Sequence, residues 1–207
     1  IVALGTCGEN AALNAEEKRR VLSALVEVAK GRVPVIAGVT EFTTPVACEY
    51  ARDARRIGVD GLMVLPAMVY VPAPDELIAH FATVARATDL PVMLYNNPPA
   101  YRVNITMPVL EKLAQENTIV AIKESAEDTR RFTDLFNAFA DRFLLFAGLD
   151  DVAFEGLALG AVGWISGLTS AFPEESVKLY DLMMQGKWHE ARAIYRWFMP
   201  LLHLDAG

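Results

Sequence analysis

A single lysine ends an apolar run in the segment "NTIVAIKESAED", residues 117–128. The run Ile119–Ile122 has the character of a buried strand, and Lys123 follows it at once. One interpretation is that the strand has ended and that the ammonium group lies in water, which is the commoner meaning of such a pattern. The other is that the amine is held where it can lose its proton and act as a nucleophile.

The chemistry of a strand-end amine depends on its surroundings. In water an amine is almost fully protonated at neutral pH and is then a poor nucleophile. Enclosure among apolar side chains favours the neutral form, which can add to a ketone and form an imine. The protonated imine withdraws electrons from the neighbouring carbon, so that a bond there can break or form.

A tyrosine occupies the matching position one strand earlier, in "LYNNPP" at residues 94–99. Tyr95 and Lys123 each close an apolar run, about one strand-plus-helix unit apart. Adjacent parallel strands lie about 4.8 Å apart, so a phenol and an amine there can converge on one small ligand. We therefore predict that Tyr95 carries protons into and out of intermediates formed at Lys123.

The segment "GTCGEN", residues 5–10, also follows an apolar run and allows two interpretations. Its glycines can serve only the geometry of a strand-to-helix turn. Alternatively, the backbone amides around Thr6 and Cys7 can bind a carboxylate, as exposed turn amides do.

These positions depend on strands and helices that alternate along the chain. Helical periodicity is typical of eight segments, and short apolar runs lie before or between the first seven of them. The helical segments are Arg19–Lys30, Val46–Ile57, Glu76–Ala87, Pro108–Gln115, Arg130–Phe139, Val152–Leu159, Pro173–Gln185 and Trp188–Leu202. The expected strands are Ile1–Leu4, Val33–Ala37, Gly61–Leu65, Pro91–Tyr95, Ile119–Ile122, Phe143–Ala147 and Ala161–Ser166.

Strands that are apolar throughout are buried on both faces, which indicates a parallel α/β sheet. An open doubly wound sheet needs about five or six strands, whereas a (β/α)8 TIM barrel needs eight. The chain has no initiator Met and begins inside an apolar run. We therefore predict a barrel over residues 1–186 that lacks its first βα unit, with residues 187–207 starting a C-terminal helical region that is cut short.

Composition narrows the function. The 207 residues carry a net charge of −7, and Lys and Arg form no basic stripe, which argues against a nucleic-acid partner. No apolar stretch approaches the length of a membrane span. Cys7 and Cys48 lie far apart, which suits a reducing, cytoplasmic setting. His80, His189 and His203 are scattered and are expected to be surface or helix-packing residues, so we expect no metal and no cofactor.

Taken together, the strand ends resemble the dihydrodipicolinate synthase/N-acetylneuraminate lyase family of Schiff-base enzymes, over essentially the whole chain. The matching motifs are "GTCGE", "LYNNP", "AIKES", "GLDD" and "GAVGWISGLTSAFP". Five motifs in the same order are far more specific than any one of them.

The resemblance implies a role for each matching residue. Lys123 would form the imine with a 2-oxo acid, Tyr95 would shuttle protons, and the Thr6 and Cys7 amides would hold the substrate carboxylate. Four further positions would line the pocket or contact the distal part of the substrate: Gly148, Ile165, Asp150 and Ser166. For Asp150 a helix N-cap is an equally good interpretation. The resemblance also implies a homotetramer.

Three departures from the family pattern bear on specificity. Cys7 stands where the family has a second threonine, and a thiol donates hydrogen bonds only weakly. The biosynthetic synthases have a tyrosine pair after the third strand that supplies a relay across the subunit interface, and here only Tyr70 is available, one place displaced. They also have an arginine where this chain has Ala100, with Arg102 two positions later.

These departures favour a catabolic enzyme that dehydrates or deaminates a 2-oxo acid or cyclic imino acid, similar to Δ1-pyrroline-4-hydroxy-2-carboxylate deaminase. A pyruvate-dependent aldolase, or dihydrodipicolinate synthase itself, is the alternative within the family. A non-catalytic 2-oxo-acid-binding protein is the alternative from another class, since one fold hosts many functions. A phosphate-binding barrel enzyme is disfavoured by the acidic segment "GLDD".

Overall fold

The computed structural model describes residues 1–67 and 69–204, which form two compact units. The first unit comprises residues 1–122 and the second begins at Lys123. The division falls inside one strand, β5 (Ile119–Glu124), so that each unit contains part of it.

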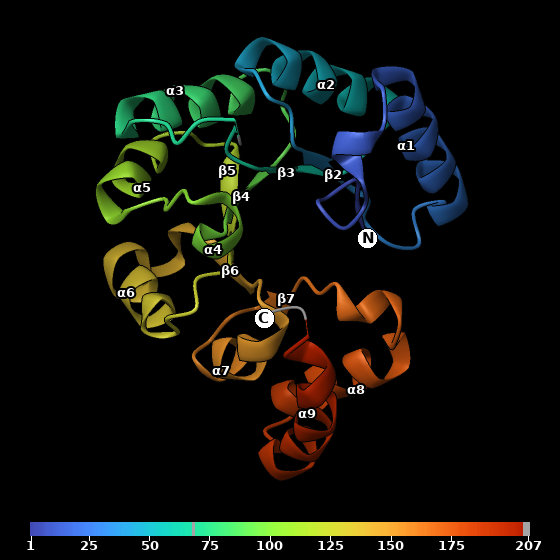
Figure 1. Cartoon of the computed structure of the whole chain (residues 1–207), viewed down its shortest axis with the longest axis vertical. Coiled ribbons are helices and arrows are strands. Elements are labelled where there is room, and N and C mark those ends of the chain that lie inside the picture. The colour runs from blue at the N-terminus through green and yellow to red at the C-terminus, as the bar shows by residue number, and fades with distance from the viewer. Residues whose placement is uncertain (68, 205–207) are drawn as a thin grey trace. The chain divides into compact units, whose positions relative to one another are not determined.

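The first unit is a layer of parallel strands covered by helices (Figure 1). Its register pairs Ala3 with Ala37, Gly38 with Met63, and Met63 with Met93. The strands are β1 (Val2–Ala3), β2 (Ile36–Val39), β3 (Gly61–Val64), β4 (Val92–Asn96) and the first four residues of β5. The helices are η1 (Asn10–Ala12), α1 (Ala15–Ala29), α2 (Thr44–Ile57), α3 (Pro74–Ala85), α4 (Pro98–Tyr101) and α5 (Met107–Leu113).

Local sequence explains where these elements start. β3 is buried at every position, as its unbroken apolar sequence predicts. α1 begins at Ala15 because the Asn14 side chain accepts from the amides of Glu16 and Glu17, and Glu17 returns a bond to the Asn14 amide. This reciprocal capping box fixes the start of the helix.

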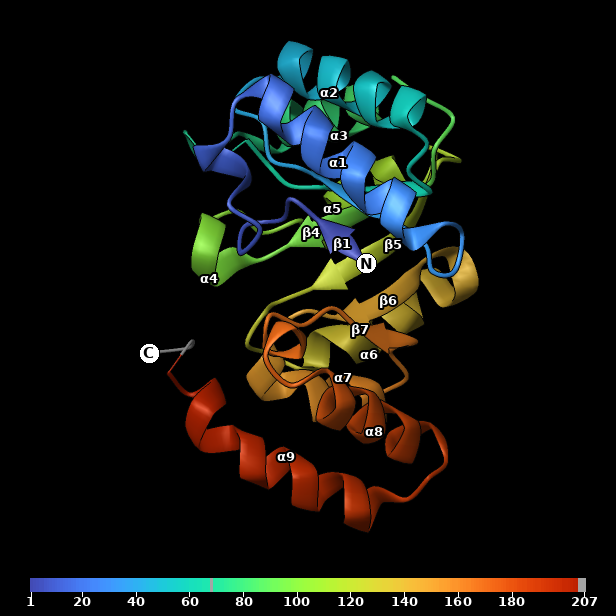
Figure 2. The ribbon, with the colours of Figure 1, turned by 90° about the vertical axis from the view of Figure 1, so that its right-hand side faces the viewer.

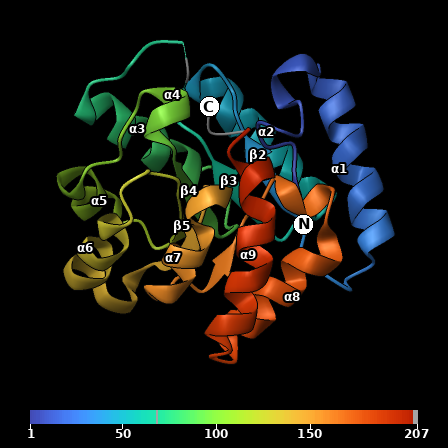
Figure 3. The ribbon, with the colours of Figure 1, turned by 60° about the horizontal axis from the view of Figure 1, so that its bottom comes forward.

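The second unit continues the alternation with shorter strands (Figure 2). β6 and β7 are parallel, pairing Phe146 with Gly163 and Ala147 with Trp164. Helices α8 and α9 pack side by side (Figure 3). The elements are α6 (Arg130–Phe139), η2 (Ala140–Arg142), β6 (Leu144–Ala147), η3 (Asp150–Val152), α7 (Ala153–Ala158), β7 (Gly163–Trp164), η4 (Leu168–Ser170), α8 (Pro173–Met184) and α9 (Trp188–Leu202).

The strand order follows the chain from β1 to β7, which confirms the predicted parallel α/β sheet of seven strands. The predicted terminal helix also matches, since α9 spans Trp188–Leu202. The missing first βα unit and the boundary between residues 1–186 and 187–207 stay predictions. No helix of the described residues is long and apolar enough to cross a membrane.

Candidate active site

The turn after β1 presents unused backbone donors. Gly8 and Glu9 donate their amides to the carbonyl oxygens of Gly5 and Thr6, at 3.0 and 3.1 Å. Within residues 1–67 and 69–204, the amides of Thr6 and Cys7 donate to no other group. Both residues are exposed. The turn can therefore offer two adjacent N–H groups to an anion, and carboxylate binding by Thr6 and Cys7 stays a prediction.

A glycine in the neighbouring strand allows this turn to lie where it does. Leu4 has a φ of 56°, which carries the chain out of β1, and its carbonyl passes close to Gly38 in β2. A Cβ added at Gly38 would lie 2.3 Å from the Leu4 oxygen. Only glycine fits beneath this backbone, so the residue at position 38 sets the approach of the Thr6 turn to the sheet.

Two tyrosine rings meet beside this turn. Tyr95 is the second-to-last residue of β4 and Tyr101 ends α4. Their rings pack edge to face with centroids 5.5 Å apart, next to Met63 and Leu65. The rings are only 6% and 8% exposed. The hydroxyls of Tyr101 and Thr6 share a hydrogen bond. The structure thus links Thr6 to Tyr101, a contact that the sequence prediction missed.

The position of Tyr101 follows from a short local signal. Asn97 accepts from the Ala100 amide at 3.1 Å and Pro98 follows it, so α4 starts immediately after β4. One turn of helix then brings Tyr101 back beside Tyr95. An asparagine before a proline is a recognisable helix start, and it could have predicted this return.

In the second unit, Lys123 lies at the end of β5 with 9% of its surface exposed. The lysine is therefore not the solvated strand end of the first interpretation. Glu124, which follows it, is 1% exposed and pairs with Arg131 of α6 at 2.5 Å. This ion pair attaches the end of the strand to the helix that follows.

Gly148 directly follows β6 and contacts the segment that follows Lys123. Its amide donates to the Glu124 carbonyl at 2.8 Å. A Cβ added at Gly148 would lie 1.8 Å from the Ser125 hydroxyl oxygen, which has no hydrogen-bond partner among the described residues. The absence of a side chain at position 148 therefore makes room for Ser125.

Asp150 is the centre of a polar cluster after β6 and β7. Its carboxylate accepts from the Trp164 indole at 2.9 Å and from the Leu168 amide at 3.0 Å. Burial raises the pKa of Asp150, while these donors, a hydrogen bond from Ser166 and the charge of Lys123 oppose the rise. The N-cap alternative is wrong, because the side chain bonds to Trp164 of β7 and Leu168 of η4, and neither η3 nor α7 has a side-chain cap.

The two remaining predicted residues lie after β7. The Ile165 amide donates to the Ala147 carbonyl at 3.0 Å, which extends the pairing of β6 and β7 by one bond. The Ser166 hydroxyl accepts from the Thr169 amide at 3.1 Å. Asp150 and Ser166 thus both accept from backbone amides of η4 in the second unit.

Each unit therefore carries a group of strand-end residues. Thr6 and Tyr95 are connected through Tyr101 in the first unit, whereas Cys7 is exposed and its thiol is free. Lys123 and Asp150 belong to the second unit. The convergence of Tyr95 and Lys123 on one ligand stays a prediction.

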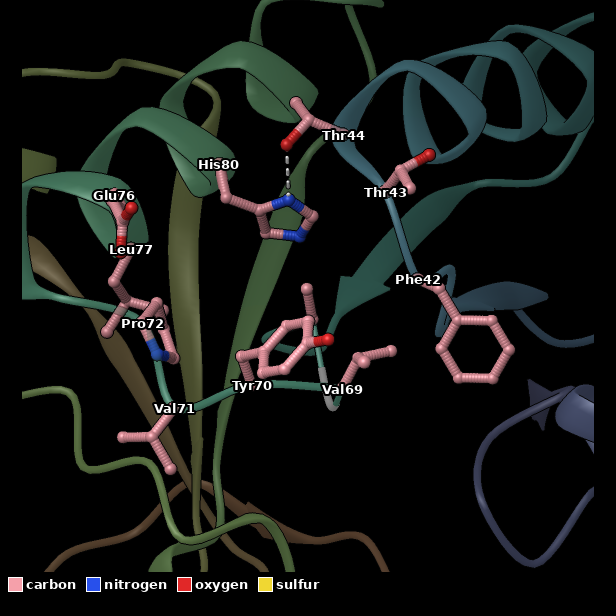
Figure 4. Close-up of a pocket in the computed structure, with 11 residues that line it drawn as sticks. Phe42, Thr43, Thr44, Val69, Tyr70, Val71, Pro72, Glu76, Leu77 and His80 are labelled. Atoms are coloured by element: carbon pink, nitrogen blue, oxygen red, sulfur yellow. Dashed lines mark hydrogen bonds between the residues drawn. The ribbon is translucent and has the colours of Figure 1, made fainter.

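A pocket of about 230 Å³ in the first unit lies beside the segment that follows β3 (Figure 4). His80 of α3 lines it, and its ring bonds to the Thr44 hydroxyl at 2.9 Å and the Leu65 carbonyl at 3.3 Å. Burial lowers the pKa of His80. The predicted helix-packing role of this histidine is thus confirmed. The described lining contains no lysine, so we assign no imine chemistry to it.

Parallel βα units with a buried lysine at one strand end fit the class of barrel-type enzymes that react through an amine. The chain belongs to the dihydrodipicolinate synthetase family, whose model matches residues 1–206. The predicted family and enzyme class are therefore confirmed: this is a lyase family that works through a lysine Schiff base.

Relatives and solved structures agree with this assignment. The chain is 36% identical over 205 residues to a 4-hydroxy-tetrahydrodipicolinate synthase of Geotalea uraniireducens, covering 99% of this chain and 70% of the relative. The synthase structure from Methylacidiphilum fumariolicum SolV has a TM-score of 0.94 at 32% identity, covering 98% of this chain and 68% of that one. That likeness confirms the TIM-barrel type of fold.

A third structure concerns the substrate. It is the chloride-inhibited dihydrodipicolinate synthase of Acinetobacter baumannii in complex with pyruvate, with a TM-score of 0.93 and 29% identity, covering 98% of this chain and 70% of that one. The chain spans about two thirds of the length of the relatives that it matches.

Proposed function

We propose that the protein is a lyase in which Lys123 forms an imine with pyruvate or another small 2-oxo acid. We further propose that this imine supports carbon–carbon bond formation of the 4-hydroxy-tetrahydrodipicolinate synthase type. The observation that carries the proposal is the buried position of Lys123 at the end of β5. The relatives favour the synthase reaction over the deamination that the sequence departures suggested.

The chemistry can be followed through this chain's own groups. The Thr6 and Cys7 amides bind the carboxylate of the 2-oxo acid, which orients its carbonyl carbon. The Lys123 nitrogen adds to that carbon, the carbonyl oxygen gains protons, and water leaves as the imine forms. Loss of a proton from the adjacent methyl group then gives an enamine, whose carbon attacks the second substrate. Tyr95 supplies and accepts these protons.

Borohydride trapping tests the proposal directly. Treating the protein with pyruvate and then borohydride should reduce the imine and leave a mass adduct on the peptide that contains Lys123. Lys123→Arg should abolish the adduct, because a guanidinium does not form this imine. Lys112→Arg, at an exposed position of α5, is the matched control and should keep it. An adduct that persists in Lys123→Arg, or none in the parent protein, would overturn the proposal.

Turnover separates catalysis from binding alone. Imine formation without turnover of any second substrate would indicate the non-catalytic 2-oxo-acid-binding protein. The synthase reaction predicts that product forms when pyruvate is supplied together with an aldehyde substrate that carries a carboxylate. Exposed Arg102, whose guanidinium has no partner among the described residues, is available to bind that second carboxylate.

Deamination or dehydration is the second candidate, and one observation favours it. The exposed position 100 on α4 carries alanine where the synthases have arginine. Because position 100 has no arginine, a substrate with a single carboxylate would not leave a buried or idle cationic side chain without a partner at that position. Incubation with hydroxypyrroline carboxylate tests this reaction, since it should release ammonia and 2-oxoglutarate semialdehyde. No release means that deamination is wrong.

We also propose that the protein assembles as a homotetramer. Four exposed apolar side chains of the first unit support a subunit contact: Phe42, Val69, Tyr70 and Val71. Figure 4 shows them beside one another around the pocket. Exposed apolar groups of this kind are typical of interaction surfaces.

A further inference from the structure

Three hydroxyl groups of the first unit form a continuous series. The rings of Tyr95 and Tyr101 pack edge to face with centroids 5.5 Å apart, and the Tyr101 hydroxyl shares a hydrogen bond with Thr6. The two phenols are buried, whereas Thr6 is exposed. The series therefore leads from the interior of the unit to its surface within one chain.

Asn97 holds both phenols of this series in place. Its side-chain amide donates to the Tyr95 oxygen at 3.0 Å, and its carbonyl caps the start of α4, the helix that ends in Tyr101. The edge-to-face contact of the rings further restricts their rotation. Oxygens held in this way can exchange protons without first having to find one another.

The protonation state of Tyr101 suits a group that passes protons on. Burial raises the pKa of Tyr101, and the neighbouring Tyr95 phenol raises it further, while the bond to Thr6 acts in the opposite direction. The phenol therefore keeps its proton at neutral pH and acts as a donor. A hydroxyl can donate one proton and accept another at the same time, which is what a relay needs.

We propose that Tyr101 is the second phenol of an intrachain proton relay, which runs from Tyr95 through Tyr101 to Thr6 and the solvent. This inference rests on the proposed imine chemistry at Lys123. When Tyr95 gives its proton to the departing oxygen of the intermediate, Tyr101 reprotonates it. Thr6 reprotonates Tyr101, and water reprotonates Thr6. At each transfer one O–H bond breaks and one forms, so no oxidant or reductant is required.

The relay makes Tyr70 unnecessary for proton transfer. Tyr70 was the tyrosine that the sequence offered for this role, and it is 84% exposed in the chain. A relay through Tyr70 would have to be completed by a second copy of the protein. A relay through Tyr101 is complete in each chain.

The test compares Tyr101→Phe with Tyr70→Phe by rapid mixing with pyruvate, quenching with borohydride and measuring the adduct on Lys123. Phenylalanine keeps the ring contact with Tyr95 and removes only the hydroxyl. We expect Tyr101→Phe to slow adduct formation about 100-fold, the usual contribution of a positioned proton donor, while the pyruvate concentration at half-saturation changes less than about threefold. Tyr70→Phe should form the adduct at the parent rate.

A second pair of variants distinguishes a relay from packing. Thr6→Val should slow the adduct as Tyr101→Phe does, and Thr6→Ser should restore it because it returns the hydroxyl. The solvent deuterium isotope effect of the parent should fall in Tyr101→Phe. A parent rate in Tyr101→Phe, or a slow rate confined to Tyr70→Phe, would overturn the relay and leave the imine proposal intact. Absence of any adduct in the parent would overturn both.

Discussion

At the scale of single residues, the Asp150 carboxylate depends on neighbouring hydrogen-bond donors for its orientation. A carboxylate near the Lys123 amine must stay in one orientation if it is to contact a substrate. The Trp164 indole and the Leu168 amide fix its two oxygens, at 2.9 and 3.0 Å. Two donors on separate elements leave the side chain little rotational freedom.

The raised pKa of Asp150 gives a prediction about stability and pH. Because the folded protein holds this proton more tightly than the unfolded chain, stability falls as pH rises from the ordinary value of 3.8 towards the raised one, and then levels off. Asp150→Asn cannot titrate. The free energy of unfolding of the parent, measured by urea titration and compared with Asp150→Asn, should therefore decrease as pH rises above about 4.

Asp151→Asn corrects this comparison for the loss of one negative charge in the same segment. A difference between the parent and Asp150→Asn that grows with rising pH would have the wrong sign. Such a result would mean that the hydrogen bonds and the charge of Lys123 outweigh burial.

Residue identities could be predicted from the motifs, but their partners could not. Asp150 was expected either at the substrate or at a helix N-cap, and its bond to Trp164 spans 14 positions. The bond between Tyr101 and Thr6 spans 95 positions. Contacts over such separations depend on how strands are placed side by side, which periodicity does not encode.

At the scale of elements, the strands and helices follow from hydrophobic pattern, and their ends follow from local chemistry. The strand expected over Ala161–Ser166 is reduced to Gly163–Trp164. The Ser166 hydroxyl accepts from the Thr169 amide, and the Asp150 carboxylate accepts from the Leu168 amide. These side-chain hydrogen bonds stabilise the turn that ends the strand. An apolar run predicts a strand, but it does not show where side-chain hydrogen bonds to backbone amides replace the backbone hydrogen bonds between strands.

The ion pair between Glu124 and Arg131 gives the prediction at this scale. Their side chains are 0% and 12% exposed, and their atoms are 2.5 Å apart. Arg131→Ala would leave the buried carboxylate without this counter-charge, which costs about 3–5 kcal/mol. Arg130→Ala is the matched control, since Arg130 pairs with Asp128 at side-chain exposures of 86% and 52%. Its loss should leave stability nearly unchanged, because water screens an exposed ion pair.

Urea unfolding of the two alanine variants measures this difference. Equal free energies of unfolding for Arg131→Ala and Arg130→Ala would contradict the prediction. They would show that α6 is not attached to the end of β5 through this ion pair.

At the scale of the whole molecule, the alternation of strands and helices alone predicted a parallel α/β fold of the barrel type, without information on side-chain contacts. Seven buried parallel strands require crossover helices, and the resulting strand ends are where such enzymes place their chemistry. The division at Ile122 and Lys123 was not predictable, because it lies within one continuous apolar strand. Periodicity describes elements one at a time and does not show which of them form a compact unit.

The proposed homotetramer gives the prediction at the scale of the whole molecule. The segment after β3 exposes Val69, Tyr70 and Val71 by 51%, 84% and 60%. If this surface is a contact between copies of the chain, a charge placed there must be buried without a partner on assembly. Val71→Asp should therefore lower the mass measured by light scattering from that of a tetramer to half or less. Val28→Asp on α1, where valine is 64% exposed, should leave the mass unchanged. A tetramer that survives Val71→Asp, or one that Val28→Asp disrupts equally, would place the contact elsewhere.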